Sequence, residues 1–371
     1  MRKGNVYNIA LILLTGALLF GFGIAILIGK KPEYSETENK RLSNVLKPTA
    51  ENLANGSFFE SVSDFYKDRF PAKSEFLALR AASELALLKG ENNRVIFGED
   101  GYLIPRGEYV ELDTAKENLA FLRELQNEAE GRGKDFLLLP VPRSIDIMES
   151  ALPRLYRGEQ NKIWSLIESA EIDCLFVSDS LRELADKGGY VQYRTDHHLT
   201  TAGAYAVYGE IGRSLGFSPC PEGFFRVETV SDSFYGTSYS KAGEIWGRAD
   251  SVELYRYAGD GDFIIEVSES GQRLSGFYDE SYLDKKDKYS VFLGGNYGML
   301  TVKRGGEERE SLLIIKDSYA NAMIPFLAIH YDLTVIDPRY FVEDIYALMD
   351  EADGVLAVIG ADTLATTPLA P

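Results

Sequence analysis

The sequence predicts a doubly wound α/β fold, in which helices cover both faces of a mostly parallel sheet. Five short apolar runs favour this class, because their composition suits strands that are buried on both faces. The runs are FLLLPV at 136–141, CLFV at 174–177, SLLIIK at 311–316, LTVID at 333–337 and GVLAVI at 354–359. Amphipathic stretches separate most of them, at 114–130, 158–170, 200–215, 319–330 and 341–351. Such alternation is typical of a parallel sheet wound by helices.

Two further regions flank or interrupt this pattern. Between 51 and 88 apolar residues recur at helical spacing, and the break DRFP divides two expected helices. The segment NRVIFGEDGYLIP then predicts a hairpin that turns at residues 99–101. From about 224 to 306 the chain is rich in Tyr, Gly and short β-like runs. We expect a β-rich insertion there, or long loops above the carboxyl edge of the sheet, where α/β sites form.

The N-terminus predicts a membrane anchor over residues 1–29. The run IALILLTGALLFGFGIAILI carries no charge and matches the length that a helix needs to cross a bilayer. It is longer than the apolar part of an ordinary signal peptide, and no small-residue cleavage site follows it. Lysines and arginines flank both ends, so local charge does not decide the orientation. Residues 30–49 suit a polar linker, and the folded domain is expected at 50–371.

Composition excludes some classes of partner. The formal net charge of −18 argues against binding of nucleic acid by bulk attraction, because phosphate neutralisation requires clustered Lys and Arg. Cys174 and Cys220 are too few and too far apart to define a metal site or a redox motif. A disulfide between them and two free thiols both stay open, and neither lies near the anchor, where it could be lipidated.

A serine at the turn of a strand-turn-helix is the predicted nucleophile. In SLLIIKDSYANAMIPFL, Ser318 follows an apolar strand and opens a helix. Its own N–H and that of Tyr319 are expected at the positive end of that helix, ready for a developing oxyanion. The alternative is an ordinary helix cap, since Asp and Ser are the favoured capping residues.

The segment TDHHLTTAGA supplies the partners that such a serine requires. His198 is the predicted general base, and Asp196 is the carboxylate that holds its tautomer. Thr200 or Thr201 is expected to cap the helix that follows. A structural, hydrogen-bonded histidine is the alternative interpretation of this Asp-x-His unit.

The same segment invites comparison with a metal site. Asp196, His197 and His198 are all potential ligands, but adjacent side chains on an extended segment point apart, and no further His or Cys cluster completes a coordination set. We therefore predict no metal. His330, in the apolar run FLAIHYDL, is predicted to be structural.

Two glycine-containing turns add candidates for substrate binding. FLGGN ends a predicted strand, so Gly295 and Asn296 are candidate oxyanion donors, although a tight turn explains the same residues. FYGTSYSKAG suits the wall of a sugar pocket, and its Ser238 is the rival nucleophile.

Five motifs in order resemble a known family. ENKRLSNVLKPT, DRFP, VIFGEDGYLI, TDHHLTTAGAY and KDSYANAMIPFL are similar to segments of the bacterial DHHW proteins. That family is related to the periplasmic alginate O-acetylation proteins, which carry an SGNH-hydrolase-like domain. The resemblance covers nearly the whole chain after the anchor.

The resemblance implies a circularly permuted SGNH arrangement in which Asp and His precede the serine. Its Asp-x-His-Trp motif falls on Asp196, His198 and Leu199, and its Ser-Tyr segment falls on Ser318 and Tyr319. Position 199 departs from the pattern. Leucine in place of tryptophan leaves the Asp-His pair intact and puts in doubt a stacking role for an aromatic ring against a sugar.

Together these features predict a single-pass cell-membrane protein whose extracytoplasmic domain is a serine O-acetyltransferase. The expected acceptor is a cell-envelope or exported polysaccharide, and the reaction runs through an acyl-serine without a cofactor. The family likeness implies a multispanning membrane acyltransferase as partner. Two alternatives stay open: a polysaccharide acetylesterase with the same triad, and a catalytically inactive envelope scaffold or glycan-binding subunit.

Overall fold

The computed structural model describes residues 3–29, 32–35, 40–107, 110–154, 156, 162–306 and 309–369. The chain divides into two compact units, Met1–Leu87 and Leu88–Pro371. The expected start of the folded part near residue 50 falls within the first unit. Part of the polar segment 30–49, predicted as a linker, lies outside the described residues.

The first unit is mainly helical. It contains α1 (Lys3–Ile28), α2 (Ala50–Ala54), α3 (Ser57–Asp68), α4 (Lys73–Ala86) and the short strands β1 (Tyr34–Ser35) and β2 (Lys40–Arg41). The predicted break at DRFP separates α3 from α4. Among the described residues one stretch, Tyr7–Ile28, is long and apolar enough to cross a membrane, with a mean hydropathy of 2.7. A signal sequence satisfies the same criterion, so this helix is a candidate single-pass anchor.

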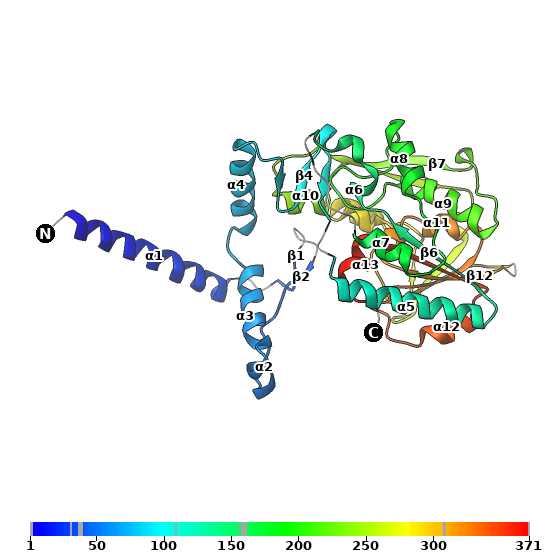
Figure 1. The fold of residues 1–371 in the computed structure, drawn as a ribbon, viewed down its shortest axis with the longest axis horizontal. Coiled ribbons are helices and arrows are strands. Elements are labelled where there is room, and N and C mark those ends of the chain that lie inside the picture. The colour runs from blue at the N-terminus through cyan, green and yellow to red at the C-terminus, as the bar shows by residue number, and fades with distance from the viewer. Residues whose placement is uncertain are drawn as a thin grey trace. The chain divides into compact units, whose positions relative to one another are not determined.

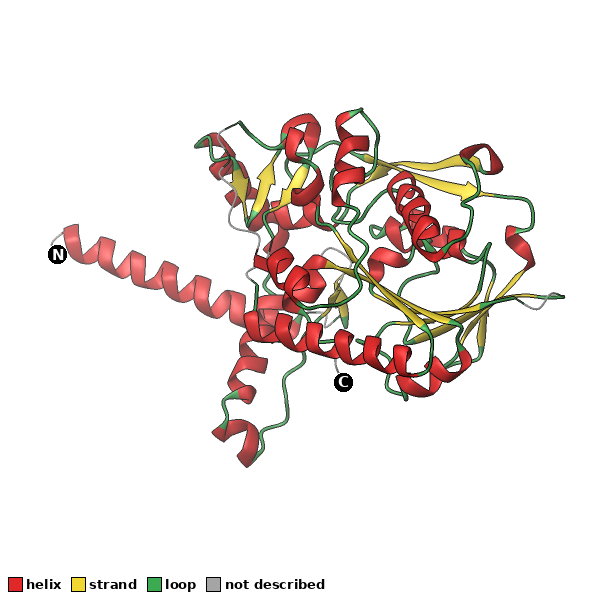
Figure 2. Ribbon diagram, turned by 45° about the vertical axis from the view of Figure 1, so that its right-hand side comes forward, coloured by secondary structure: helices red, strands yellow, loops and turns green. Residues whose placement is uncertain are grey.

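The second unit is built on a seven-stranded mixed sheet (Figures 1 and 2). Its order is β10-β9-β11-β13-β12-β14-β6, and β13, β12, β14 and β6 run parallel. The strands are β6 (Asp135–Val141), β9 (Phe263–Val267), β10 (Gln272–Leu274), β11 (Met299–Arg304), β12 (Ser311–Lys316), β13 (Asp332–Ile336) and β14 (Gly354–Gly360). The predicted central parallel sheet is therefore confirmed.

Helices cover both faces of this sheet, as the doubly wound prediction requires (Figure 1). One apolar layer contains α5 (Leu112–Gly131), α7 (Lys162–Ser169), α12 (Ile345–Glu351) and α13 (Ala361–Thr366). The opposite layer contains α6 (Ser144–Ile147), α8 (Ser178–Asp186), α9 (Thr201–Leu215) and α11 (Ile324–Leu327). Successive side chains of β12 point to opposite faces of the sheet. Leu313 and Ile315 pack in the first layer, and Leu312 and Ile314 pack in the second.

Two smaller sheets complete the second unit. β3 (Glu91–Asn92), β4 (Val95–Phe97) and β5 (Leu103–Pro105) form one, and the predicted hairpin turn at residues 99–101 joins β4 to β5. β7 (Arg226–Phe234) and β8 (Asp250–Arg256) form the other, with α10 (Thr237–Ala242) between them in sequence.

The β-rich region at 224–306 is not a separate lobe. Only β7 and β8 form a sheet of their own, whereas β9, β10 and β11 extend the main sheet in antiparallel fashion from β13. The expectation of a lobe or of loops alone is therefore wrong for these three strands. Pairing with β11 satisfies the backbone groups along the edge of β13.

Three predicted elements differ from the structure. The strand expected before the turn FLGGN is a 3-10 turn, η6 (Lys288–Val291), followed by a single bridge from Phe292 to Tyr278. CLFV at 174–177 is not a strand: Leu138 exchanges backbone hydrogen bonds with Asp173 and Leu175, both of 2.8 Å, and the chain then turns into α8. The helix expected at 319–330 is a short 3-10 turn, η7 (Ser318–Ala320), followed by α11. Pro325 lies in the first turn of α11, where its missing N–H is tolerated, so a new helix begins there.

A matched pair of glycines in α9 gives a prediction for stability. A Cβ at Gly203 would lie 2.1 Å from the carbonyl oxygen of Val191, whereas a Cβ at Gly209 would meet nothing within 4 Å. We expect Gly203→Ala to lower the free energy of unfolding by about 1–3 kcal/mol through overpacking. Gly209→Ala should raise it by about 0.5–1 kcal/mol, because alanine favours the helix. Thermal unfolding of the full chain measures both; equal melting temperatures would contradict the predicted close packing at residue 203.

Candidate active site

Ser318 lies at the carboxyl end of β12, where the chain turns into η7. Asp317 caps this turn: its Oδ1 accepts the N–H of Tyr319 at 2.9 Å, and its Oδ2 accepts the N–H of Gly360 at 2.9 Å and the hydroxyl of Thr363 at 2.6 Å. The capping role that the sequence allowed for either residue thus falls to Asp317. The hydroxyl of Ser318 is left available for another partner.

That partner is His198. The Oγ of Ser318 lies 2.8 Å from Nε2 of His198, and Nδ1 of the same ring lies 2.6 Å from Oδ1 of Asp196. The three side chains that the sequence singled out as nucleophile, base and carboxylate therefore form one continuous chain of hydrogen bonds. This is the arrangement that activates a serine hydroxyl for attack.

Asp196 is the buried centre of this chain, with 2% of its surface exposed. Its Oδ1 also accepts the N–H of His198 at 3.0 Å, and its Oδ2 accepts the N–H of Thr237 at 2.8 Å and its hydroxyl at 2.9 Å. Burial opposes ionisation of Asp196, but the two neighbouring histidines and these hydrogen bonds outweigh it and hold its pKa below the usual range. The carboxylate is therefore ionised.

The loop that carries Asp196 and His198 is fixed by buried polar residues that the sequence did not reveal. The fully buried carboxylate of Asp250 accepts the N–H of Arg194 at 2.7 Å and that of Thr195 at 2.8 Å. Nε2 of Gln192 donates to the carbonyl of Asp196 at 3.1 Å and to that of His198 at 2.7 Å. The contacts of Asp250 join positions 56 and 55 residues apart, whereas Gln192 lies four and six residues before its partners; no local motif marks either residue.

Gly236 and Thr237 complete the surroundings of Asp196. A Cβ at Gly236 would lie 2.3 Å from Oδ2 of Asp196, so only glycine lets the backbone come this close. The motif FYGTSYSKAG drew attention to Ser238, but its neighbours Gly236 and Thr237 are the residues that contact the carboxylate.

Tyr289 packs against the ring of His198. Its ring stacks on that of His198, with centroids 3.7 Å apart and planes 6° apart, and its hydroxyl donates to the carbonyl of Ser318 at 3.0 Å. Leu199, which takes the position of the family's tryptophan, is 2% exposed in the apolar core. An aromatic contact with His198 thus exists here, but it comes from a different element.

The remaining candidates occupy different surroundings. Ser238 lines the same cleft as Ser318, and its buried Oγ has no hydrogen-bond partner among the described residues. Asn296 accepts from Nζ of Lys316 at 2.9 Å and from Nδ2 of Asn321 at 3.1 Å, and the carbonyl of Gly295 accepts from Asn321 at 3.4 Å. Neither Gly295 nor Asn296 lines the cleft.

One expectation about the oxyanion requires correction. Tyr319 lines the cleft, but its N–H already donates to Asp317, so it does not form the expected donor pair with the N–H of Ser318. The reason is that Asp317 rather than Ser318 caps the turn. The N–H of Ser318 itself makes no backbone hydrogen bond in the described part of the chain.

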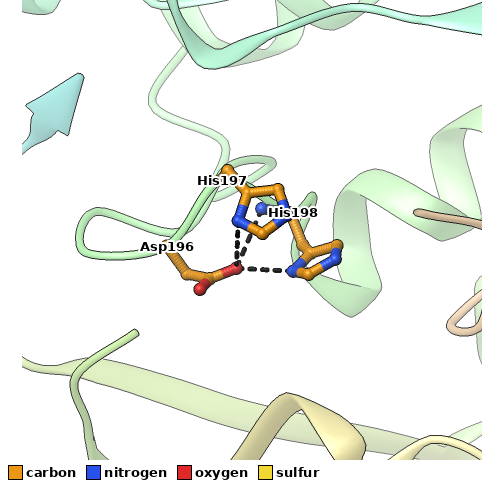
Figure 3. Close-up of side chains that lie close together, drawn as sticks. All are labelled: Asp196, His197 and His198. Carbon is orange, nitrogen blue, oxygen red and sulfur yellow. Dashed lines mark hydrogen bonds and ion pairs between the residues drawn. The ribbon is translucent and has the colours of Figure 1, made fainter. Parts of the chain in front are cut away.

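We expected the side chains of His197 and His198 to point apart, which would disfavour a metal site. In the structure they lie close together. Residues 194–198 form bends, and the ring centroids of His197 and His198 lie 3.9 Å apart, so the candidate ligand atoms of both rings and of Asp196 fall within 4.8 Å (Figure 3). The nitrogens are nevertheless engaged: both of His198 in the triad, and Nδ1 of His197 with the hydroxyl of Thr237 at 2.7 Å. A metal ion would have to displace these hydrogen bonds.

A cleft of about 290 Å³ adjoins Ser318. Its walls come from the β3-β4 turn, the end of β5, the loop that carries His197, α10, η7, α13 and the segment after β13. Four cationic side chains contribute to the lining, together with Asp362: Arg94, Arg106, Lys241 and Arg339. Arg339 is held by Asp337 through bonds of 2.8 and 2.6 Å. Although the whole chain is acidic, this cleft is rich in hydrogen-bond donors.

Comparison with known proteins confirms the predicted resemblance. The family model described as DHHW protein matches residues 163–336, a span that contains Asp196, His198 and Ser318. Among the curated proteins, none matches the sequence.

Solved structures show the same fold. A DHHW family protein from Eubacterium siraeum has 19% identity and a TM-score of 0.60, covering 75% of this chain and 94% of its own. PatB1 of Bacillus cereus, determined with a sulfonyl adduct, has 16% identity and a TM-score of 0.63, covering 75% of this chain and 98% of its own. The predicted SGNH-hydrolase-like α/β fold is therefore confirmed.

Two neutral histidines predict how stability depends on pH. Burial, reinforced by His198, lowers the pKa of His197 from 6.5 to about 4, and burial beside Arg309 lowers that of His330 to about 4. Between these pKa values the unfolded chain binds more protons than the folded one, so stability should fall as pH drops from about 6.5 to about 4. Denaturant titrations across this pH range measure the free energy of unfolding, and so the slope of that free energy against pH.

His330→Gln is the matched variant for this measurement. Glutamine can accept the hydrogen bond that Tyr208 makes to Nε2 of His330, at 2.6 Å, but it does not titrate. For His330→Gln, the free energy of unfolding should change less with pH than it does for the unmodified chain. An unchanged slope would show that His330 is not held neutral by the fold.

Proposed function

We propose that this chain is a membrane-anchored, outward-facing serine O-acetyltransferase that modifies a cell-envelope or exported polysaccharide. The observation that carries the proposal is the unbroken hydrogen-bond chain from Ser318 through His198 to the ionised Asp196. A serine activated in this way forms covalent acyl intermediates. The resemblance to the DHHW proteins supports acetyl as the transferred group.

The proposed reaction has two steps at one serine. Nε2 of His198 takes the proton of Ser318 as Oγ attacks the acetyl donor, and the proton then passes to the leaving group. A sugar hydroxyl next attacks the acetyl-serine and gives its proton to His198. The bond between the acyl carbon and Oγ of Ser318 then breaks, Oγ takes the proton back from His198, and the sugar leaves as the acetyl ester. Asp196 stabilises the imidazolium in both steps, and the N–H of Ser318 is the proposed donor to the oxyanion. The triad itself requires no cofactor.

The apolar N-terminal helix supports the anchoring part of the proposal. Tyr7–Ile28 has the length and composition of a span, which would keep the catalytic unit beside the membrane. The family likeness supports a multispanning acyltransferase as the partner that delivers acetyl across the bilayer.

A polysaccharide acetylesterase is the second candidate. The side chain of His197, next to the catalytic histidine in the cleft, is 33% exposed, so water can reach the acyl-enzyme as well as a sugar can. Release of acetate that an added glycan does not diminish would favour the esterase. Acetyl transfer to that glycan would favour the transferase.

Removing the nucleophile should abolish acylation. We expect Ser318→Ala to reduce acetyl-enzyme formation from a chromogenic acetyl ester by at least about 10³-fold, because no other hydroxyl is hydrogen-bonded to His198 among the described residues. His198→Ala should have a similar effect, and His197→Ala a smaller one. Intact-mass measurement after incubation with the ester detects the added acetyl group.

Ser238→Ala is the comparison that tests the rival nucleophile. Undiminished acetylation of Ser318→Ala, together with its loss in Ser238→Ala, would transfer the nucleophilic role to Ser238. A chain that binds glycan but is never acetylated would instead support the inactive scaffold.

A further inference from the structure

The triad leaves His197, the first histidine of the Asp196-His197-His198 segment, without a role. His197 lines the cleft beside Ser318 and is 33% exposed on its side chain. Its ring lies 3.9 Å from that of His198, centroid to centroid, and contacts the ring of Tyr319 edge-on at 5.4 Å. It is thus close enough to the nucleophile to contact whatever the acyl-enzyme reacts with.

The hydrogen bonds around Thr237 determine the tautomer of His197. The hydroxyl of Thr237 lies 2.9 Å from Oδ2 of Asp196 and 2.7 Å from Nδ1 of His197. An ionised carboxylate only accepts, so the single hydroxyl proton of Thr237 goes to Asp196. The oxygen of Thr237 must then accept from His197, and Nδ1 of His197 carries a proton.

The opposite assignment is unfavourable. If Thr237 donated to His197, its lone pairs would face the buried carboxylate of Asp196 at 2.9 Å, and one acceptor position of that carboxylate would lose its donor. Leaving a buried charged acceptor unpaired costs several times what an ordinary hydrogen bond contributes. Burial, together with the neighbouring His198, also lowers the pKa of His197 to about 4, so the ring is neutral near pH 7.

It follows that Nε2 of His197 carries a lone pair. Among the described residues no group donates to this nitrogen. Four cationic donors line the same cleft, and among them Nε2 of His197 is an uncharged acceptor beside Ser318. It matches a hydroxyl group, which donates one proton and carries no charge.

We propose that His197 positions the acceptor by accepting a hydrogen bond, through Nε2, from a second hydroxyl next to the one that reacts. The reacting hydroxyl gives its proton to His198, while its neighbour on the sugar ring donates to His197. The site thereby selects a vicinal diol, which is the common arrangement on a pyranose ring. The inference deepens the proposed acetyltransferase function and rests on it; His197 transfers no proton itself.

The tautomer can be tested without any substrate. The chain contains only three histidines, so ¹⁵N-histidine NMR with His198→Ala and His330→Gln resolves each ring. We expect His197 to show a protonated Nδ1 and an unprotonated Nε2 near pH 7. A protonated Nε2 would overturn the inference, whether or not the chain acetylates anything.

Acceptor selectivity is tested with small alcohols. Acetyl transfer from the chromogenic ester to cis-1,2-cyclohexanediol and to cyclohexanol is compared per hydroxyl. One hydrogen bond to the second hydroxyl should favour the diol by about three- to tenfold. In His197→Asn this preference should fall to about one, because the amide can still donate to Thr237 but does not reach the position of Nε2.

His197→Gln is the matched variant, since its longer side chain can present a carbonyl oxygen near the position of Nε2. It should keep more of the preference for the diol than His197→Asn does. An equal preference in the unmodified chain and in His197→Asn would overturn the inference while acetylation of Ser318 continued. Absence of the acetyl-enzyme in the unmodified chain would instead contradict the proposed function.

Discussion

The ionised carboxylate of Asp196 is the centre on which the site depends. A buried charge is unfavourable unless it is hydrogen-bonded, and here both oxygens have donors: His198 at Oδ1 and Thr237 at Oδ2. The first set orients the base toward Ser318, and the second orients the hydroxyl that in turn holds His197. Because glycine at 236 allows the backbone to come within contact distance, a single carboxylate orders both histidines.

A second group of buried charged side chains lies at the strand ends next to Ser318. The parallel register of β12 and β13 pairs Ile315 with Ile336 and so brings Lys316 next to Asp337, with Nζ 3.9 Å from the carboxylate. Burial lowers the pKa of Lys316 to about 8, although Asp337 opposes this shift. Asp337 also holds Arg339 at the cleft. Charged side chains at the ends of the neighbouring strands β12 and β13 therefore pair with one another at the carboxyl edge of the parallel sheet, where sites of α/β proteins form.

Much of the architecture was predictable because it follows from local patterns. Continuous apolar runs predicted the parallel strands, and helical periodicity predicted α5, α9 and α12. The predictions from local sequence failed for two segments whose structure depends on the neighbouring strands. CLFV makes a single bridge to β6. β11 pairs with the edge of β13, and β9 pairs with β11, so these strands extend the main sheet. Neither outcome depends on the residues of the segment alone.

Local sequence patterns were enough to place a serine after a buried strand, and Asp and His before a capped helix. The folded structure adds that the predicted pair, His198 and Ser318, lie within hydrogen-bonding distance, that Asp317 is the cap, and that Gly236, Thr237, Asp250 and Tyr289 surround the site. The two kinds of interaction act over different distances along the chain. Periodicity and capping act over a few residues, whereas a hydrogen bond between residues 120 positions apart depends on sheet register and loop packing.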